Sequence, residues 1–401
     1  GVRAMTDRLY YGDAYRTAFD AVVQECREAG GKALVRLDRS AFYPTSGGQP
    51  YDTGALNGAR VSDVFVDGAG EVWHEVDSPL APGEIVLGQI DWARRFDHMQ
   101  QHSGEHMLAG AIYRQLRGHV IGLHLGAEVS TIDVELPGGG TRISDEAIRS
   151  LELDVNEKIQ TDVPVVCSFP DADALRAMPL RKPPTVERNV RVVAIGDFEC
   201  VACGGTHVRS TGQIGLLKVV DARPSKGKMR VSFVAGMRAY RDYQRQYDLA
   251  GAAARLFSTS VDRLPDAVAA VQGQLRDASR ALTALRREKL FSEIPEMLRG
   301  ARALSSGARL VIKKFEADAQ LLRELAGKLI AEGNVAALLA ADAGGSNLFV
   351  FARSQDVDID MGKLLSSSAR ARGGKGGGRP DFAEGGGPDA VLFEAEKALT
   401  E

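Results

Sequence analysis

Cysteine is scarce in this sequence of 401 residues, which has four, at positions 26, 167, 200 and 203. Their scattered spacing excludes a disulfide framework. The sequence also lacks an apolar run long enough to span a membrane and the apolar core of a signal peptide. We therefore expect a cytoplasmic protein that does not bind a membrane.

An excess of positive charge is missing as well. The 50 Lys and Arg residues face 53 Asp and Glu residues, so the net charge is −3. A uniformly basic nucleic-acid-binding domain is therefore excluded. The length suits about two to four domains.

Two pairs of candidate metal ligands are present. His102 and His106 are four residues apart, and Cys203 and His207 repeat this spacing later in the chain. Imidazole and thiolate are ligands that zinc prefers, and four of them complete a tetrahedral site. The two pairs together therefore predict a zinc site.

The first pair is expected on a helix that begins at Asp97. Asp97 is a suitable N-cap, Gln100 completes a capping box, and Gly118 follows as a stop signal. Residues four apart lie on one helix face, so His102 and His106 can hold one ion. The helix is expected to bury one apolar stripe, formed by Leu108, Ile112 and Leu116.

Cys203 and His207 are expected on a turn between strands. Residues 190–195 alternate like a buried strand, Gly204 and Gly205 allow a tight turn, and residues 214–220 have the pattern of the next strand.

Each motif alone has another explanation. A lone histidine pair at this spacing is more often two ordinary helix residues than a ligand pair. Cys200 and Cys203 form a Cys-x2-Cys motif, but a redox motif opens a helix and here two glycines follow. We favour the zinc site because the two pairs occur together.

Segment patterns divide the chain into four expected parts. Residues 5–90 contain short alternating segments separated by glycine turns, which is typical of a small β-barrel. Residues 91–237 mix helices and strands and hold both ligand pairs. Residues 238–305 are helical, and residues 306–401 form an α/β unit. The expected strands are 33–37, 59–66 and 71–76 in the barrel and 310–312, 335–339 and 348–351 in the last part, which also has a helix at 319–330.

The helical part carries three heptads of apolar residues. This pattern predicts either a seam between two copies of the chain or a helix pair within one chain, and three heptads are the lower limit for a coiled coil. Both alternatives stay open. The apolar positions are Leu264, Val268, Val271, Leu275, Ala278, Leu282 and Leu285.

The ligand motifs, His102-Ser-Gly-Glu-His106 and Cys203-Gly-Gly-Thr-His207, resemble those of alanyl-tRNA synthetase editing domains and of the free-standing AlaX proteins. Segment 42–54 resembles the glycine-rich part of the barrel that precedes the editing core. Segments 122–126, 130–133 and 181–188 are also similar to the family. The glycine run 373–380 resembles the C-terminal domain shared with DHH-type phosphoesterases, so the likeness spans nearly the whole chain and the long AlaX type fits best.

The resemblance implies a multi-domain α+β fold: an N-terminal β-barrel, a zinc-containing editing domain, a coiled-coil segment and a glycine-rich C-terminal α/β domain. It also implies a trans-editing hydrolase that uses Zn²⁺ to deacylate mischarged tRNA(Ala). Serine is the expected amino acid and glycine a second one. No adenylate-forming synthetase core precedes Tyr10, so we expect hydrolysis of aminoacyl-tRNA and not its synthesis.

Two rival functions remain open. One is a tRNA-binding zinc protein without turnover. The other is a DHH-type phosphoesterase, suggested by Asp97-His98, although Met99 breaks the Asp-His-His signature and no further aspartate cluster for two metals follows.

Hydrolysis of the aminoacyl ester requires a water that attacks the carbonyl. Glu105 is the acid–base candidate, although it points about 100° away from the ligand face of the helix and is equally typical of an exposed glutamate. Synthetases often carry threonine there, which is a departure from the family pattern. Thr45, Gln49 and Glu105 are the candidates that read a serine hydroxyl.

The surroundings of the metal leave further choices. His124 and Asp133 are candidates for hydrogen bonds that orient the metal ligands. With four protein ligands the metal site is closed, whereas with three it keeps an open position for catalysis. The sequence leaves both arrangements open.

Contacts with RNA phosphates are expected in local basic clusters, although a cluster seen alone is more often a solvated face. The glycine-rich segment 373–387 is either a flexible linker or a loop whose backbone approaches the RNA, and the helical segments around it favour the loop. The expected tRNA-contacting residues are Arg223, Lys226, Lys228, Arg230, Gly376, Gly377, Gly378 and Arg379, and the remaining basic residues of the clusters are Arg181, Lys182, Arg370, Arg372 and Lys375.

Overall fold

The computed structural model describes residues 5–186 and 188–401, so Glu187 of the segment 181–188 lies outside the described residues. The chain divides into two compact units, and the division falls between Ala252 and Ala253. Within the described residues, no helix combines the length and the apolar character that crossing a bilayer requires.

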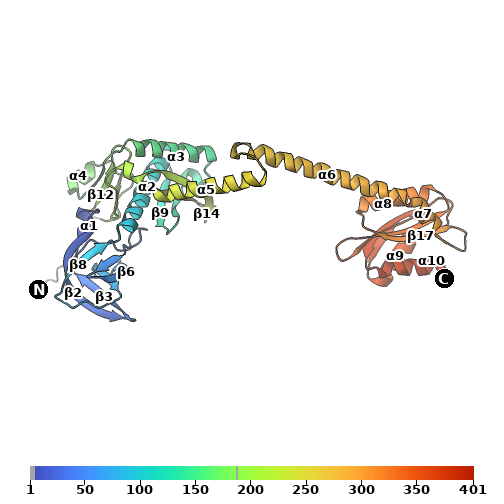
Figure 1. Cartoon of the computed structure of the whole chain (residues 1–401), viewed down its shortest axis with the longest axis horizontal. Coiled ribbons are helices and arrows are strands. Elements are labelled where there is room, and N and C mark those ends of the chain that lie inside the picture. Colours follow the sequence, from blue (N-terminus) through green and yellow to red (C-terminus); the bar gives the residue numbers. More distant parts are fainter. Residues whose placement is uncertain (1–4, 187) are drawn as a thin grey trace. The chain divides into compact units, whose positions relative to one another are not determined.

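The first unit begins with a closed barrel of six strands in the order β2-β3-β7-β6-β5-β8 (Figure 1). Alternate residues such as Val35, Leu37 and Val61 are fully buried and fill its interior. The predicted small barrel is therefore confirmed. Its strands are β2 (Ala18–Ala29), β3 (Lys32–Leu37), β5 (Gly54–Leu56), β6 (Ala59–Val66), β7 (Val72–Val76) and β8 (Ile85–Ile90), and the short elements β1 (Asp7–Arg8), α1 (Leu9–Gly12) and β4 (Arg39–Ser40) flank them.

Helix α2 (Trp92–Leu116) follows the barrel directly. Every residue from 98 to 112 is buried, so the helix is enclosed on all sides instead of burying only the predicted stripe. The helix ends one residue before Arg117, which adopts a left-handed conformation with φ 54°, and Gly118 comes next.

The predicted start of this helix at Asp97 is wrong. The N-cap is Asp91, whose side chain accepts a hydrogen bond from the backbone N–H of Arg94 at 3.2 Å. Asp97 lies inside the helix and pairs with Arg238. Gln100 completes no capping box, because its side-chain amide donates to the backbone carbonyl of Gln213 at 3.0 Å.

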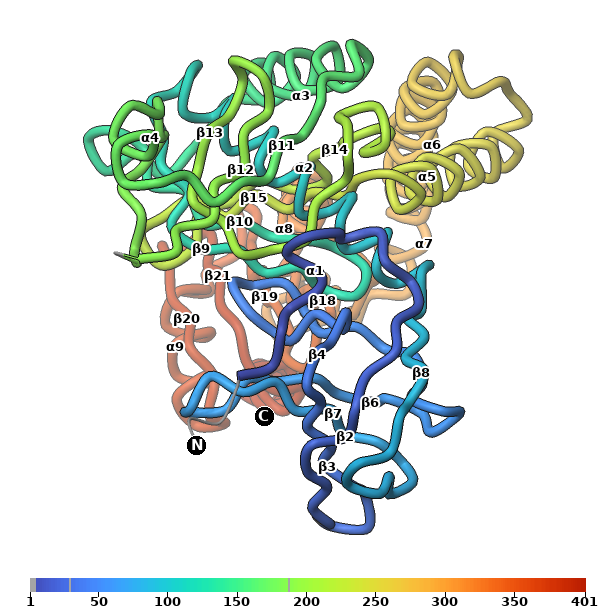
Figure 2. The backbone as a smooth tube through the Cα atoms, turned by 90° about the vertical axis from the view of Figure 1, so that its left-hand side faces the viewer, coloured from blue at the N-terminus to red at the C-terminus, as the bar shows by residue number. Residues whose placement is uncertain are grey.

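The rest of the first unit packs a four-stranded sheet, β14-β15-β10-β9, and a three-stranded sheet, β11-β12-β13, around α2. In Figure 2 the barrel strands occupy one end of this unit and helices α3 and α4 the other. The elements are β9 (His119–Leu125), β10 (Ser130–Glu135), α3 (Asp145–Gln160), β11 (Val165–Ser168), α4 (Ala172–Ala177), β12 (Val192–Ile195), β13 (Glu199–Ala202), β14 (Leu217–Ser225), β15 (Lys228–Ala235) and α5 (Met237–Leu256). The strand predicted at 214–220 starts later, because Thr211–Ile214 form a 3-10 turn.

The second unit contains a six-stranded sheet in the order β16-β17-β18-β19-β21-β20. Alternate residues of β18 face opposite sides: Leu338 joins the core beneath α9 and α10, whereas Leu339 joins the core beneath α8. The predicted strands and helix of this part are confirmed. The elements are β16 (Arg302–Ala303), β17 (Arg309–Phe315), α8 (Ala319–Ala331), β18 (Val335–Asp342), β19 (Asn347–Arg353), α9 (Met361–Arg372), β20 (Lys375–Gly378), β21 (Phe382–Gly387) and α10 (Ala390–Thr400).

The heptads lie on one helix, α6 (Leu264–Ser292), which α7 (Ile294–Arg299) follows. No residue of α6 is buried, and the side chains of Leu275, Leu282 and Leu285 are 70%, 50% and 63% exposed. The heptad face therefore has no covering helix within the described part of the chain, and the seam between two copies stays a prediction.

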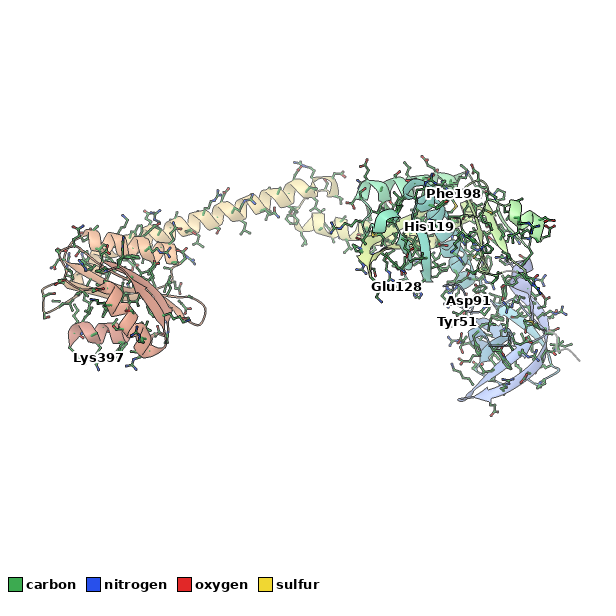
Figure 3. The ribbon with its side chains drawn as sticks, turned by 180° about the vertical axis from the view of Figure 1, so that it is seen from behind. Tyr51, Asp91, His119, Glu128, Phe198 and Lys397 are labelled. Carbon is green, nitrogen blue, oxygen red and sulfur yellow. The ribbon has the colours of Figure 1, made fainter. Side chains whose placement is uncertain are left out.

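A buried ion pair joins the barrel to α2. Arg95 and Asp52 are both fully buried, and the Arg95 Nε lies 3.0 Å from the Asp52 Oδ1. Arg95 also donates to the backbone carbonyls of Ala14 and Ala41, at 2.7 and 2.6 Å, and Asp52 accepts from the N–H of Tyr43 at 2.6 Å. Tyr51 and Asp91 mark this junction in Figure 3.

Asp52→Ala is expected to lower the free energy of unfolding of the first unit by about 3–5 kcal/mol, because it leaves the buried Arg95 without its counter-charge. Urea denaturation followed by circular dichroism measures the change. The control is Asp197→Ala, which removes an ion pair with Lys158 whose carboxylate is 89% exposed and should change stability by less than about 1 kcal/mol. Equal effects of the two substitutions would contradict the role of Arg95 and Asp52.

Candidate metal centre

Four side chains from two distant segments meet inside the first unit. His102 and His106 project from α2, whereas Cys203 and His207 project from the loop that follows β13. Their candidate ligand atoms all lie within 4.8 Å of one another. The Cys203 Sγ lies 3.4 Å from the Nε2 of both His102 and His207. The structure thus brings together all four predicted ligands in an arrangement that can hold a metal ion.

The outer nitrogens of two histidines have protein partners. The His102 Nδ1 lies 2.8 Å from the Gln49 Oε1, which is an acceptor, so this nitrogen carries the proton and Nε2 keeps its lone pair for the centre. The His207 Nδ1 lies 3.2 Å from the Ser103 Oγ. In contrast, both ring nitrogens of His106 are buried without a hydrogen-bond partner among the described residues. A metal ion would give one of these two nitrogens a partner.

Gln49 reaches this centre from the loop between β4 and β5 and is completely buried. Its Oε1 also accepts from the N–H of Thr206 at 3.1 Å, and its Nε2 donates to the Thr206 hydroxyl at 2.7 Å. Its contacts fix His102 and the loop of Cys203. The prediction that Gln49 reads the substrate stays a prediction, since these bonds use only one of the two N–H groups on Nε2.

Two further residues shape that loop. A Cβ on Gly205 would lie 2.1 Å from the His102 Cε1, so only glycine lets the loop approach the imidazole this closely. Arg191 is buried, and its Nη1 donates to the carbonyls of Cys203 and Gly205 at 3.0 and 2.8 Å. Sequence reasoning missed Arg191, although a lone cation among the apolar residues of 190–195 was a usable signal.

Burial controls the protonation of the ligands. It lowers the pKa of His102 to about 3 and holds the pKa of His106 and His207 well below the usual value, so all three imidazoles are neutral at pH 7. Burial also raises the pKa of the Cys203 thiol to about 12. A bound cation opposes this effect because it stabilises the thiolate.

Glu105 lies beside the centre. Its carboxylate oxygen is 3.9 Å from the His106 Nε2, and the residue is 5% exposed. The alternative of an exposed surface glutamate is therefore wrong. Burial raises the pKa of Glu105 to about 7, and the nearby carboxylate of Glu199 acts in the same direction while Arg181 opposes it.

Three other candidates lie away from the centre. Thr45 is exposed, and its hydroxyl accepts from the N–H of Tyr51 at 3.2 Å. His124 is exposed on β9. Asp133 forms two bonds with Arg230, at 2.8 and 2.9 Å. Among the described contacts, none joins these three side chains to the four ligands, so the expected support from His124 and Asp133 is absent from them.

The predicted RNA-contacting residues have mixed surroundings. Arg230 and Arg223 pair with Asp133 and with Asp221, respectively, on the hairpin of β14 and β15. Lys226 and Gly227, both with positive φ, form the turn of this hairpin.

Segment 373–387 contains the paired strands β20 and β21, so it is neither a flexible linker nor the loop that we expected. A Cβ on Gly376 would lie 2.9 Å from the Leu365 side chain and one on Gly378 would lie 2.3 Å from a backbone oxygen, whereas Gly377 has open space. Arg379 pairs with Asp381 at 3.3 Å. Gly376 and Gly378 thus have a packing reason to be glycine.

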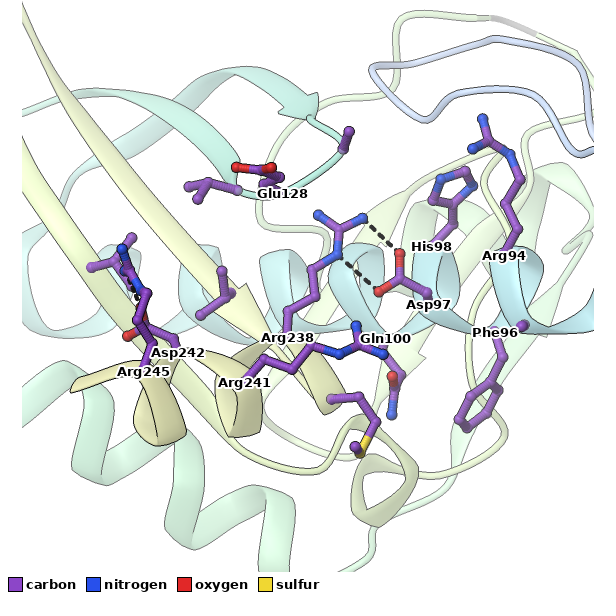
Figure 4. A pocket seen from close by; sticks show the side chains of 16 residues that line it. Arg94, Phe96, Asp97, His98, Gln100, Glu128, Arg238, Arg241, Asp242 and Arg245 are labelled. Carbon is purple, nitrogen blue, oxygen red and sulfur yellow. Dashed lines mark hydrogen bonds and ion pairs between the residues drawn. The ribbon is translucent and has the colours of Figure 1, made fainter. Parts of the chain in front are cut away.

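Asp97 and His98, the basis of the phosphoesterase alternative, line a separate pocket of about 840 Å³ (Figure 4). Asp97 is paired with Arg238 at 2.8 and 2.6 Å, and none of the four ligand side chains lines this pocket. Within the described residues, the only cluster of His, Cys, Asp and Glu side chains that could hold a metal ion is the centre of His102, His106, Cys203 and His207. These contacts leave the phosphoesterase alternative without a metal cluster.

Gly205→Ala is expected to abolish metal binding, because the new methyl group would displace the His102 ring. Metal content per chain, measured by mass spectrometry of the purified protein, is the readout. Gly204→Ala is the matched control, since a Cβ there meets only the Tyr11 hydroxyl at 3.6 Å. Full metal occupancy in the Gly205 variant would show that the loop does not depend on this close approach.

Two segments of the chain match known protein families. The family model described as "Threonyl and Alanyl tRNA synthetase second additional domain" matches residues 190–232, and the model of the DHHA1 domain matches residues 307–401. The crystal structure of the C-Ala domain from Aquifex aeolicus alanyl-tRNA synthetase matches 25% of this chain and 93% of that domain, with 28% identity and a TM-score of 0.23.

Curated relatives match over nearly the whole chain. Alanine–tRNA ligase of Halorubrum lacusprofundi is 33% identical over 97% of this chain, and that of Natronomonas pharaonis is 34% identical over 99%. The chain spans only 43% and 44% of the length of these two proteins. This chain is therefore a homologue of part of the alanine–tRNA ligases and carries their second additional domain and a DHHA1 domain, as the sequence motifs predicted.

Proposed function

We propose that this chain hydrolyses the ester of mischarged tRNA(Ala) in trans, with Ser-tRNA(Ala) as the main substrate and Gly-tRNA(Ala) as a second one. The observation that supports this proposal most is the buried group of three histidines and one cysteine in a homologue of alanine–tRNA ligases.

Zinc is the proposed metal. Three imidazoles and one thiolate match its donor preference, and the unpartnered nitrogens of His106 fit a ligand whose partner is the ion. If three of the four side chains held the zinc and one position stayed open, the ion would supply a Lewis acid that polarises the ester carbonyl or lowers the pKa of a water.

Glu105 is the proposed proton acceptor. Its carboxylate oxygen lies 3.9 Å from the His106 Nε2, which is close enough to the centre for it to accept a proton from an attacking water. We favour Glu105 for reading the serine hydroxyl, because it is buried beside the centre, whereas Thr45 is exposed and Gln49 bonds His102 and Thr206. A site built around that hydroxyl would reject alanine, which leaves the buried carboxyl without its partner.

Two surfaces are proposed to bind tRNA and a third to bind a second copy of the chain. We expect phosphates of the tRNA to meet the hairpin of β14 and β15 at Lys226 and Lys228, with Arg223 and Arg230 contributing charge next to their acidic partners. Gly377 and Arg379 are the members of the glycine run whose positions leave room for such contacts. The exposed heptad face of α6 is the proposed seam of a homodimer.

Cys203→Ala is expected to lose both bound zinc and the hydrolysis of Ser-tRNA(Ala), because the thiolate is one of the ligands. The rate should fall by more than the roughly 10–100-fold that follows loss of an outer partner of a ligand. The measurement is release of labelled serine, with Ala-tRNA(Ala) as the substrate that should be spared. Cys200→Ala is the matched control, since Cys200 belongs to the same Cys-x2-Cys motif but not to the group of four.

A second outcome distinguishes the rival function. If the zinc-loaded protein binds tRNA(Ala) and slows the spontaneous loss of serine, it is a tRNA-binding protein and the proposal of an enzyme is wrong. Acceleration that survives in Cys203→Ala would instead contradict the role of the metal centre.

Gln49→Ala is expected to weaken zinc binding by about 10–100-fold, because His102 loses the acceptor that fixes its Nδ1 proton. Competition with a chelator measures the affinity. Thr45→Ala, in the same loop, should leave the affinity unchanged. If Gln49→Ala instead alters only the preference for serine over alanine, Gln49 reads the substrate and does not position His102.

A further inference from the structure

An aromatic pair lies on the surface next to the metal centre. Tyr11 is part of α1, and Phe169 directly follows β11. Their ring centroids are 5.7 Å apart and their planes make an angle of 75°, so the edge of one ring points at the face of the other. Phe169 is 51% exposed although it is a large apolar residue.

Two cations flank the pair. The Arg8 Nη1 donates to the Tyr11 hydroxyl at 3.4 Å, and its guanidinium carbon lies 5.9 Å from the Tyr11 ring centroid. The guanidinium carbon of Arg191 lies 5.5 Å from the same centroid. Aromatic rings interleaved with guanidinium groups are the usual surface for unpaired nucleotides.

The pair is close to the exposed side of the centre. The three ligand histidines are buried, whereas Cys203 is partly exposed and Gly204 is exposed. The Tyr11 hydroxyl lies 3.6 Å from the position of a Cβ on Gly204. A group that approaches the centre from the side of Cys203 therefore passes the Tyr11 ring.

We propose that the exposed ring of Phe169, held edge-to-face against Tyr11, stacks on the terminal adenine of the substrate RNA. The inference rests on the proposed function, because the ester to be hydrolysed sits on the ribose of that adenosine. A base stacked there would hold its ribose near Cys203, and the charge of the partly exposed Arg8 would attract the phosphate that precedes it. Stacking recognises the π-face of the base, so the proposal concerns position and not base identity.

The test uses an uncharged RNA hairpin with the acceptor stem of tRNA(Ala), whose terminal adenine is replaced by 2-aminopurine. Stacking on an aromatic ring quenches the fluorescence of this base, so binding to the wild-type protein should quench it. Phe169→Ala should abolish most of the quenching and weaken binding by about tenfold, within the range for loss of one base–aromatic stack. Phe169→Trp should restore both.

Val166→Ala is the matched control, because Val166 lies on the neighbouring strand β11 and is 54% exposed but has no ring. It should leave quenching and affinity at wild-type values. Equal quenching by the wild type and Phe169→Ala, or no quenching by the wild type, would overturn the proposal. The RNA carries no ester, so quenching without any hydrolysis of Ser-tRNA(Ala) would refute the proposed enzyme and keep the stacking surface, whereas hydrolysis without quenching would do the reverse.

Discussion

The enclosure of helix α2 is the constraint on which the first unit depends. A helix buried on all sides needs protein partners for its polar side chains, because burying them without hydrogen bonds costs free energy. Arg95 therefore pairs with Asp52 in the segment between β4 and β5, and Gln101 bonds both the N–H and the carbonyl of Ala235 in β15 at 2.9 Å. Ser103 accepts from the N–H of Val208 at 3.2 Å. These bonds fix the position of each neighbouring segment, and the ligand loop is one of them.

The short ligand motifs predicted the four side chains of the metal centre but not the residues that position them. The spacing of His102 and His106 and of Cys203 and His207 was sufficient to identify the group, because residues four apart share a helix face and the second pair has the same spacing. Gln49 and Thr206 are 157 positions apart. The local sequence pattern around either residue does not predict this contact. The wrong helix start has a similar cause, since Asp91 and Asp97 are both suitable caps and only the tertiary partner Arg238 explains why Asp97 is internal.

In the second unit, amino-acid composition did not predict the local structure of the glycine-rich segment. A run rich in glycine is compatible with a linker, yet here it forms two paired strands. The absence of side chains lets α9 lie directly on them, since Gly362 of α9 approaches the backbone of Gly378 so closely that a Cβ would lie 2.5 Å from its oxygen. The apolar periodicity of α6 was visible in the sequence, but whether a second helix covers it depends on contacts outside a single chain.

The distance in sequence between the two ligand pairs has a consequence for biosynthesis. Cys203 follows His102 by 101 residues, so a ribosome completes the barrel and the whole of α2 well before it adds the second half of the centre. During that interval His102 and His106 form at best a weak two-ligand site on a helix that still lacks the partners that enclose it. The metal can therefore bind fully only after the segment through His207 has emerged and packed against α2. A chain truncated before Cys203 would lack two of the four ligands.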